Sequence, residues 1–139
     1  MIGGGPSGLA AATKLKEMGF EVALIERKEE LGGILDQCIH DGFGTKIFGK
    51  ALSGPEFAGF FIDKARSLGL DVMVNTYVKD VKVHSDKKEI ITISPKGVGK
   101  IEARAVVYAL GCRERTHYEI KVGGYRPCLL YTSPSPRDS

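Results

Sequence analysis

The spacing of apolar and polar residues changes along this chain, and the first pattern is helical. Helical spacing of apolar residues predicts a helix from Pro6 to Met18, because Pro suits a first helical turn and Gly19 provides a stop. The apolar stretch "EVALIE", residues 21–26, then predicts a short buried parallel strand. The glycine-rich residues 31–50 show only weak periodicity, so they are expected to be irregular.

A second helix is predicted to begin near Ser53, where "SGPE" forms a capping box between Ser53 and Glu56. Its buried face is predicted to carry Phe57, Phe61, Ala65 and Leu68, and Gly69 ends it. Residues 70–75 then form the next predicted strand. Strands that alternate with helices in this way indicate parallel pairing with right-handed crossovers.

The pattern changes at Thr76. Residues 76–103 contain three short alternating segments, "TYVKDVKV", "EIITIS" and "GKIEA", separated by polar turns. This arrangement predicts a three-stranded antiparallel meander. Residues 105–110, "AVVYAL", are again continuously apolar and predict a buried parallel strand closed by Gly111. The predicted fold class is therefore α/β, a Rossmann-like parallel sheet that carries an antiparallel β-meander.

Composition narrows the function only slightly. With 139 residues, 42% of them hydrophobic and 27% charged, the chain is long enough for one domain. Its net charge of +3 gives no reason to expect nucleic acid as a partner, and no apolar run is long enough for a membrane segment. The three cysteines follow no metal or disulfide spacing. We therefore expect no metal site and a cytoplasmic location.

The candidate chemistry begins in "GGGPSGLAAA", in which Gly3, Gly5 and Gly8 fit the pattern G-x-G-x-x-G. In a dinucleotide-binding turn these glycines allow the tight turn, the approach of a pyrophosphate, and helix–strand packing, respectively. A glycine turn of purely structural use remains an equal alternative for this motif alone. Glu26 strengthens the first interpretation, because an acid about 20 residues beyond the glycines is suited to bind ribose hydroxyls. The alternative is that Glu26 is a solvated charge at a strand end.

Four motifs occur in order: the glycine turn with Pro6 in "GGGPSGLAAA", then Glu26 and the Gly32-Gly33 doublet in "IERKEELGG", and the A-x-G turn at Ala109 and Gly111 in "VVYALGCRER". Together they give a resemblance that extends to about Pro127. The chain resembles the FAD-binding half of the two-dinucleotide flavoprotein family related to glutathione reductase and thioredoxin reductase. The resemblance implies FAD as cofactor and NAD(P)H as co-substrate, with hydride passing from nicotinamide to flavin. It also implies an unknown electron donor or acceptor, and another oxidoreductase subunit as a possible partner. The implied cofactor-binding residues are Gly3, Gly5, Pro6, Ser7, Gly8, Glu26, Arg27, Gly33, Ile34, Val78, Ala109 and Gly111.

No catalytic residue can be assigned from the sequence. Disulfide reductases of the family use a pair of neighbouring thiols, whereas Cys38 stands alone in "DQCIHDG". Disulfide reductase activity is therefore not expected. Cys38 and His40 are weak candidates for groups that face the flavin, with His40 as a proton carrier. The alternative is a loop that only packs around the cofactor.

Members of the family that this chain resembles begin with several more apolar residues, which form the central strand before the glycines. At the other end, residues 128–139, "CLLYTSPSPRDS", resemble a translated adapter sequence, although a disordered tail remains an alternative. We therefore expect residues 1–127 to be a fragment of an FAD-binding domain, with residues 128–139 as a non-native tail. Two other readings stay open, an NAD-binding dehydrogenase domain and a fragment without activity.

Overall fold

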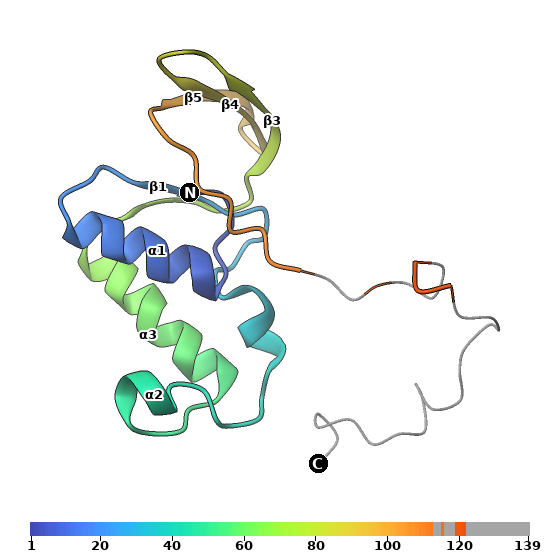
Figure 1. Cartoon of the computed structure of the whole chain (residues 1–139). Helices are drawn as coiled ribbons and strands as arrows, with labels where there is room; N and C mark the ends of the chain where they lie inside the picture. Colours follow the sequence, from blue (N-terminus) through green and yellow to red (C-terminus); the bar gives the residue numbers. More distant parts are fainter. Residues whose placement is uncertain (113–114, 116–118, 122–139) are drawn as a thin grey trace.

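The computed structural model describes residues 1–112, 115 and 119–121, and two sheets organise them. Strands β1 (Ala23–Ile25) and β2 (Asp71–Met73) form a parallel pair. Strands β3 (Tyr77–Val83), β4 (Lys88–Ser94) and β5 (Gly97–Ala103) form an antiparallel meander. Figure 1 shows helices α1 (Pro6–Glu17) and α3 (Gly54–Ser67) on one side of the parallel strands and the meander on the other. The predicted α/β class with a meander is confirmed.

The core lies where α1 and α3 pack beside β1. Its buried members are Leu9, Ala12, Leu24, Ala65 and Leu70. Small residues on both helices allow them to approach closely, and an ion pair between Lys64 Nζ and Glu17 Oε1 (2.9 Å) also joins them. The helix predicted from Pro6 is confirmed, with its last residue at Glu17 and Met18 as the C-cap.

Helix α3 begins with the predicted capping box. The Ser53 amide donates to Glu56 Oε2 (2.8 Å), and the Ser53 hydroxyl accepts from the Glu56 amide (3.5 Å). Both exchanges satisfy donors that a helix start otherwise leaves open. The predicted buried face is only partly right, because Phe57 and Phe61 remain partly exposed while Gly54 and Ala58 are buried. The phenylalanines instead contact one another and Phe48 in a cluster of edge-on rings.

The meander is confirmed and is the most regular part of the sheet structure. β4 lies in its centre and pairs with β5 from Lys88 to Ser94 and with β3 from Lys88 to Ile93. A register shift interrupts the β3–β4 ladder between Val78 and Asp80. Residues 88–94 alternate in burial, and Ile90 and Thr92 lie on the covered face. The alternation explains why this part could be predicted from period two alone.

The predicted buried strand at residues 105–110 is wrong. Only one isolated parallel bridge forms there, between Ile2 and Tyr108. The exposed fractions of Val107, Tyr108 and Leu110 are 43, 59 and 68%. An apolar run is buried only when other elements cover both of its faces, and among the described residues this segment pairs with Ile2 alone. β1 and β2 are also shorter than the strands predicted over residues 21–26 and 70–75.

Residues 31–50 were predicted to be irregular, but they contain two short helical elements. A 3₁₀ helix, η1 (Gly33–Gln37), follows the glycine doublet, and α2 (Thr45–Phe48) follows Gly44. Gly44 and Gly49 have φ of 83° and 69°, so glycines in the left-handed conformation form the N-cap and the C-cap of α2. The predicted tail at residues 128–139 lies outside the described residues.

Candidate dinucleotide-binding site

The site is built around the turn that joins Ile2 to α1. Ile2 lies between Ile25 and Tyr108 and bridges both in parallel. Its amide donates to Val107 O (2.9 Å), and its carbonyl accepts from the Ala109 amide (2.8 Å). The next amide, of Gly3, donates to Ile25 O (2.8 Å). The glycine turn therefore leaves the edge of the sheet from a fixed position.

Two of the three motif glycines are required by internal packing. Gly3 has φ of +105°, and a Cβ there would overlap the carbonyl oxygen of Ala109. A Cβ on Gly8 would overlap the carbonyl oxygen of Gly3 and lie 3.3 Å from the Ala109 methyl. These contacts hold α1 tightly against the segments that precede and face it. Gly3 and Gly8 are thus explained without any ligand.

Gly5, in contrast, is not required by the fold. Its φ of −77° is open to any residue, and an added Cβ would meet only Gly33 Cα, at 4.0 Å. Gly5 is the N-cap of α1, directly before Pro6. The space in front of it is open in this structure, which is what the approach of a pyrophosphate needs. The residues present therefore fit a dinucleotide.

The start of α1 offers donors and a favourable field to such a ligand. The first intrahelical donor is the Leu9 amide, which bonds Gly5 O (2.9 Å). The amides of Ser7 and Gly8 precede it, so they have no intrahelical acceptor, while Pro6 has no amide to leave open. The first turn carries no acidic residue, and a helix N-terminus bears a partial positive charge. An anion is therefore stabilised at this end of α1.

Glu26 follows β1 and lies 8% exposed beside the turn. Its Oε2 accepts from the Gly4 amide (2.6 Å), and its Oε1 accepts from the Lys28 amide (2.8 Å). The sequence predicted a carboxylate at this place but not these two partners. The alternative of a solvated charge at a strand end is wrong, because the side chain is buried and doubly bonded. Arg27, the next predicted residue, is exposed.

The glycine doublet lies directly against the turn. The Gly32 amide donates to Gly4 O (2.9 Å), and a Cβ on Gly33 would come within 3.0 Å of Gly5 Cα. Gly32 and Gly33 have φ of 119° and 65°, which explains both glycines. Ile34 follows in η1 with 48% of its surface exposed. The doublet and the motif glycines thus meet, although many residues separate them in the chain.

Asp36 in η1 adds an acidic group below the doublet. Partial burial raises the pKa of its carboxyl above the usual range, and the charge of Glu30 raises it further. A Cβ on Gly32 would overlap Asp36 Oδ1. The carboxyl therefore occupies the place that a side chain at residue 32 would need.

The remaining predicted cofactor residues divide into near and distant ones. Ala109 contacts the turn through its bond to Ile2 and its packing on Gly8. Gly111, with φ of +70°, has open space around its Cβ position. Val78 is paired with Thr92 in the meander and is partly exposed. Among the described residues, neither Val78 nor Gly111 is hydrogen-bonded to the glycine turn.

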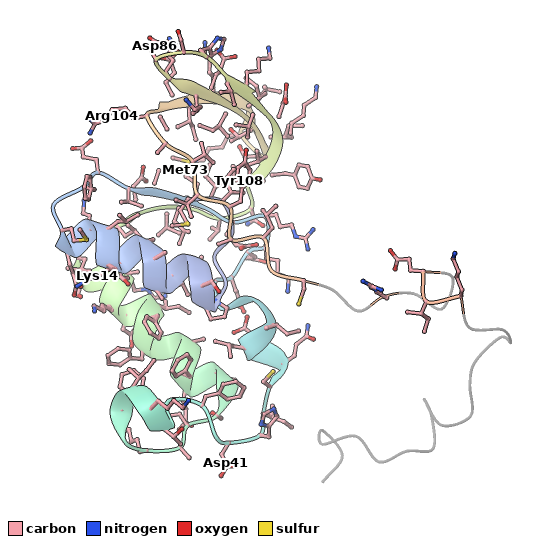
Figure 2. All side chains as sticks on the ribbon, viewed as in Figure 1. Lys14, Asp41, Met73, Asp86, Arg104 and Tyr108 are labelled. Atoms are coloured by element: carbon pink, nitrogen blue, oxygen red, sulfur yellow. The ribbon has the colours of Figure 1, made fainter. Side chains whose placement is uncertain are left out.

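The two weak catalytic candidates lie in the loop between η1 and α2. The Cys38 thiol donates to Ile34 O (3.4 Å), and its carbonyl accepts from the Gly54 amide (2.8 Å). The His40 ring packs on Phe43 with centroids 5.2 Å apart. Its Nδ1 lies 3.1 Å from the backbone oxygen of Asp41, a residue that Figure 2 places at the end of the molecule opposite the meander. These contacts hold the loop and form no proton relay.

Within the part of the chain that the structure describes, Cys38 and Cys112 are free thiols. The same residues include no group of three or more His, Cys, Asp or Glu side chains placed to hold a metal ion. None of the described helices has the length and apolar character needed to cross a bilayer.

Gly4 is a residue of the glycine turn that the sequence did not single out. A Cβ there would overlap Leu31 Cδ2 and lie 3.2 Å from Glu26 Oε2. Both backbone groups of Gly4 are bonded, to Glu26 and to Gly32. The run of three consecutive glycines was the available indication, because the motif itself requires only the first and third of them.

Several known proteins are similar to this chain over most of its length. Hydrogen cyanide synthase subunit HcnB of Pseudomonas protegens is 29% identical over 119 residues, which is 84% of this chain and 24% of that protein. Thioredoxin reductase from Streptococcus pyogenes has a TM-score of 0.70 at 26% identity, covering 83% of this chain and 35% of its own. L-Proline dehydrogenase from P. horikoshii has a TM-score of 0.69 at 26% identity, covering 79% and 21%.

The chain therefore spans about a quarter of the length of its curated relative HcnB. The family model for pyridine nucleotide-disulphide oxidoreductases matches residues 1–125. Because that match includes the glycine turn, Glu26 and the whole meander, the chain belongs to the pyridine nucleotide-disulphide oxidoreductase family and has its FAD-binding, oxidoreductase-type fold.

Proposed function

We propose that this chain is the FAD-binding part of an NAD(P)H-linked flavoprotein oxidoreductase. The observation that carries the proposal is the contrast among the motif glycines. Gly3 and Gly8 are needed for packing, whereas Gly5 keeps open a space that the fold itself does not use. A pyrophosphate bound at the start of α1 would use that space.

The proposed cofactor contacts follow from this placement. The Ser7 and Gly8 amides and the field of α1 would hold the pyrophosphate, with Gly3, Gly5 and Pro6 shaping the turn. Glu26 would bind the adenosine ribose, with Arg27 beside it. Gly33 and Ile34 would line the flavin side, and Val78, Ala109 and Gly111 would complete the cofactor site. These residues would hold and orient FAD, which when bound would supply hydride chemistry with a nicotinamide.

FAD is favoured over a simple NAD-binding dehydrogenase domain by the chain after β2. A meander, β3–β5, occupies the place where a plain nucleotide-binding half would have a crossover helix. The glycine doublet against the turn also supports a longer cofactor. The Glu26 carboxylate disfavours a 2′-phosphate on the adenosine.

The wider setting is part of the same proposal. The partners would be a nicotinamide cofactor and a further electron donor or acceptor in the cytoplasm. HcnB is named as a synthase subunit, which supports another oxidoreductase subunit as a partner here. We propose that residues 1–127 are a fragment of the FAD-binding domain, which further residues complete, and that residues 128–139 do not belong to it.

Ligand binding to the full chain at low temperature tests this proposal. Because the described site is suited to hold the pyrophosphate and adenosine, we expect ADP and FAD to compete for one site with similar affinity. FMN, which lacks the second phosphate and the adenosine, should not compete. Titrations followed by amide chemical shifts would measure all three. Preference for FMN over ADP, or FAD binding that ADP does not displace, would contradict the assignment.

Cys38 is expected to take no part in electron transfer. Its thiol bonds Ile34 O, and no second described cysteine lies in the same loop. In a longer protein that contains this chain, Cys38→Ser should leave flavin reduction by a nicotinamide within a few-fold of wild type. Stopped-flow absorbance of the flavin measures this rate. A loss of two or more orders of magnitude would instead place Cys38 in the chemistry.

A further inference from the structure

The carboxylate of Glu26 joins segments that are separate in the chain. One oxygen bonds the Gly4 amide (2.6 Å) in the glycine turn, and the other bonds the Lys28 amide (2.8 Å) in the loop after β1. The backbone of Glu26 is held as well, because its amide donates to Met73 O and its carbonyl accepts from the Thr76 amide. The carboxylate therefore projects from a fixed point toward the turn.

Both backbone groups of Gly4 are therefore held by hydrogen bonds, an arrangement that we call the clamp. Its amide bonds Glu26, and its carbonyl accepts from the Gly32 amide (2.9 Å). Gly4 is buried, and Leu31 lies close over it. Since Gly4 precedes the N-cap Gly5, fixing the Gly4 peptides also fixes the direction in which α1 begins.

The amides of the turn therefore fall into two groups, one bonded within the protein and one open to a ligand. The Gly4 amide points inward to Glu26, while those of Ser7 and Gly8 have no intrahelical acceptor. A buried amide without an acceptor is costly, so loss of the carboxylate would favour rotation of the Gly4 peptide or opening of the turn. Either change would move the N-cap away from its present position.

We propose that Glu26 is a positioning residue, which holds the glycine turn in its anion-binding geometry before any ligand is present. This role is separate from the ribose contact and rests on the proposed function only for the identity of the ligand. Its consequence is that Glu26 affects binding of the pyrophosphate part, including in ligands that have no ribose hydroxyls.

Amide hydrogen exchange of the ligand-free chain tests the clamp directly. The Gly4 and Lys28 amides should be protected in wild type. In Glu26→Gln, whose amide nitrogen cannot accept, at least one of them should exchange roughly tenfold faster or more. Glu29→Gln, the same charge change at an exposed site of the same loop, should leave both unchanged. An unprotected Gly4 amide in wild type would overturn the proposal, even if no variant folds.

A pair of ligands then separates positioning from ribose recognition. ADP carries the ribose hydroxyls, whereas 2′,3′-dideoxy-ADP does not. If Glu26 acts through the turn, Glu26→Gln weakens both ligands, by roughly tenfold each. If only ADP is weakened, Glu26 acts through the ribose alone and the proposal is wrong. Failure of wild type to bind either ligand would count against the proposed function, while the exchange result would still decide the clamp.

Discussion

Gly5→Ala is expected to abolish ADP and FAD binding while leaving the free energy of unfolding within ~1 kcal/mol of wild type. The backbone of Gly5 is extended, with φ of −77° and ψ of −175°, and the new methyl would meet only Gly33 Cα, at 4.0 Å. Alanine is a poorer N-cap than glycine, but it also lowers the entropy of the unfolded chain, and the two effects nearly offset each other. The methyl would nevertheless fill the space proposed for the pyrophosphate.

Gly8→Ala is the matched control, with the same added methyl three residues along the chain. There the methyl would overlap Gly3 O and contact Ala109, so we expect a loss of stability of ~1–3 kcal/mol or more. Thermal unfolding followed by circular dichroism, with ADP titration on the folded variants, measures both effects. Wild-type ADP affinity in Gly5→Ala would contradict the site. Wild-type stability in Gly8→Ala would contradict the packing argument.

An extension of five residues before Met1, with apolar side chains at alternating positions, is expected to raise the free energy of unfolding by roughly 2–4 kcal/mol. This figure is what remains once the entropy cost of ordering the added residues is subtracted. A cleft of about 1120 Å³ lies between Met1–Ile2, β1 and the segment 103–107. Apolar residues on its wall include Leu15, Phe20, Val22, Ile90 and Ile101. An extension in line with Met1 would enter this cleft and continue the parallel ladder already formed by Ile2.

The terminal amine gives this prediction a second readout. The Met1 amine donates to Ala23 O (2.8 Å), and burial lowers its pKa from the ordinary 8.0. The unfolded chain therefore binds more protons than the folded chain between the lowered pKa and 8.0, so stability should rise with pH across this window. In the extended chain the amine leaves the cleft, and this rise should disappear.

Chemical denaturation at several pH values would measure both effects. A serine–glycine extension of equal length is the control, since it moves the amine but buries no apolar side chain. It should remove the pH dependence without the main gain in stability. Equal stability of the apolar and polar extensions would show that the cleft does not accept a strand.

Much of this fold follows from local patterns in the sequence. α1 could be predicted from Pro6 and Gly19, α3 from the capping box at Ser53, and β3–β5 from alternation and polar turns. Each of these elements forms most of its hydrogen bonds within itself or with a chain neighbour. Residues close in sequence therefore carry the information needed to predict them.

The segment 105–110 shows where such reasoning fails. Its apolar residues indicated burial, but burial depends on what lies against the segment, and of the described residues only Ile2 pairs with it. Tyr108 bridges Ile2 on the side opposite Ile25, and more than half of its surface is exposed. The composition of a segment cannot supply its missing neighbours.

The sequence predicted where the site lies more completely than which contacts its residues make. The spacing of glycines and acid indicated where Gly3, Gly5, Gly8 and Glu26 act, and the structure brings all four together. Spacing could not reveal that only Gly5 is free of internal contacts. It also could not reveal the Lys28 amide, because any residue type supplies a backbone donor.

The order of the strand pairings also bears on how the chain folds. Each ladder of the meander joins strands that follow directly in sequence, whereas β1 pairs with β2 across the whole of α3, and Ile2 pairs with Tyr108 across nearly the whole described chain. Closing long loops costs more entropy before any contact is gained. We therefore expect β3–β5 to form early in folding, and the glycine turn, which depends on the two longest-range pairings, to be completed last.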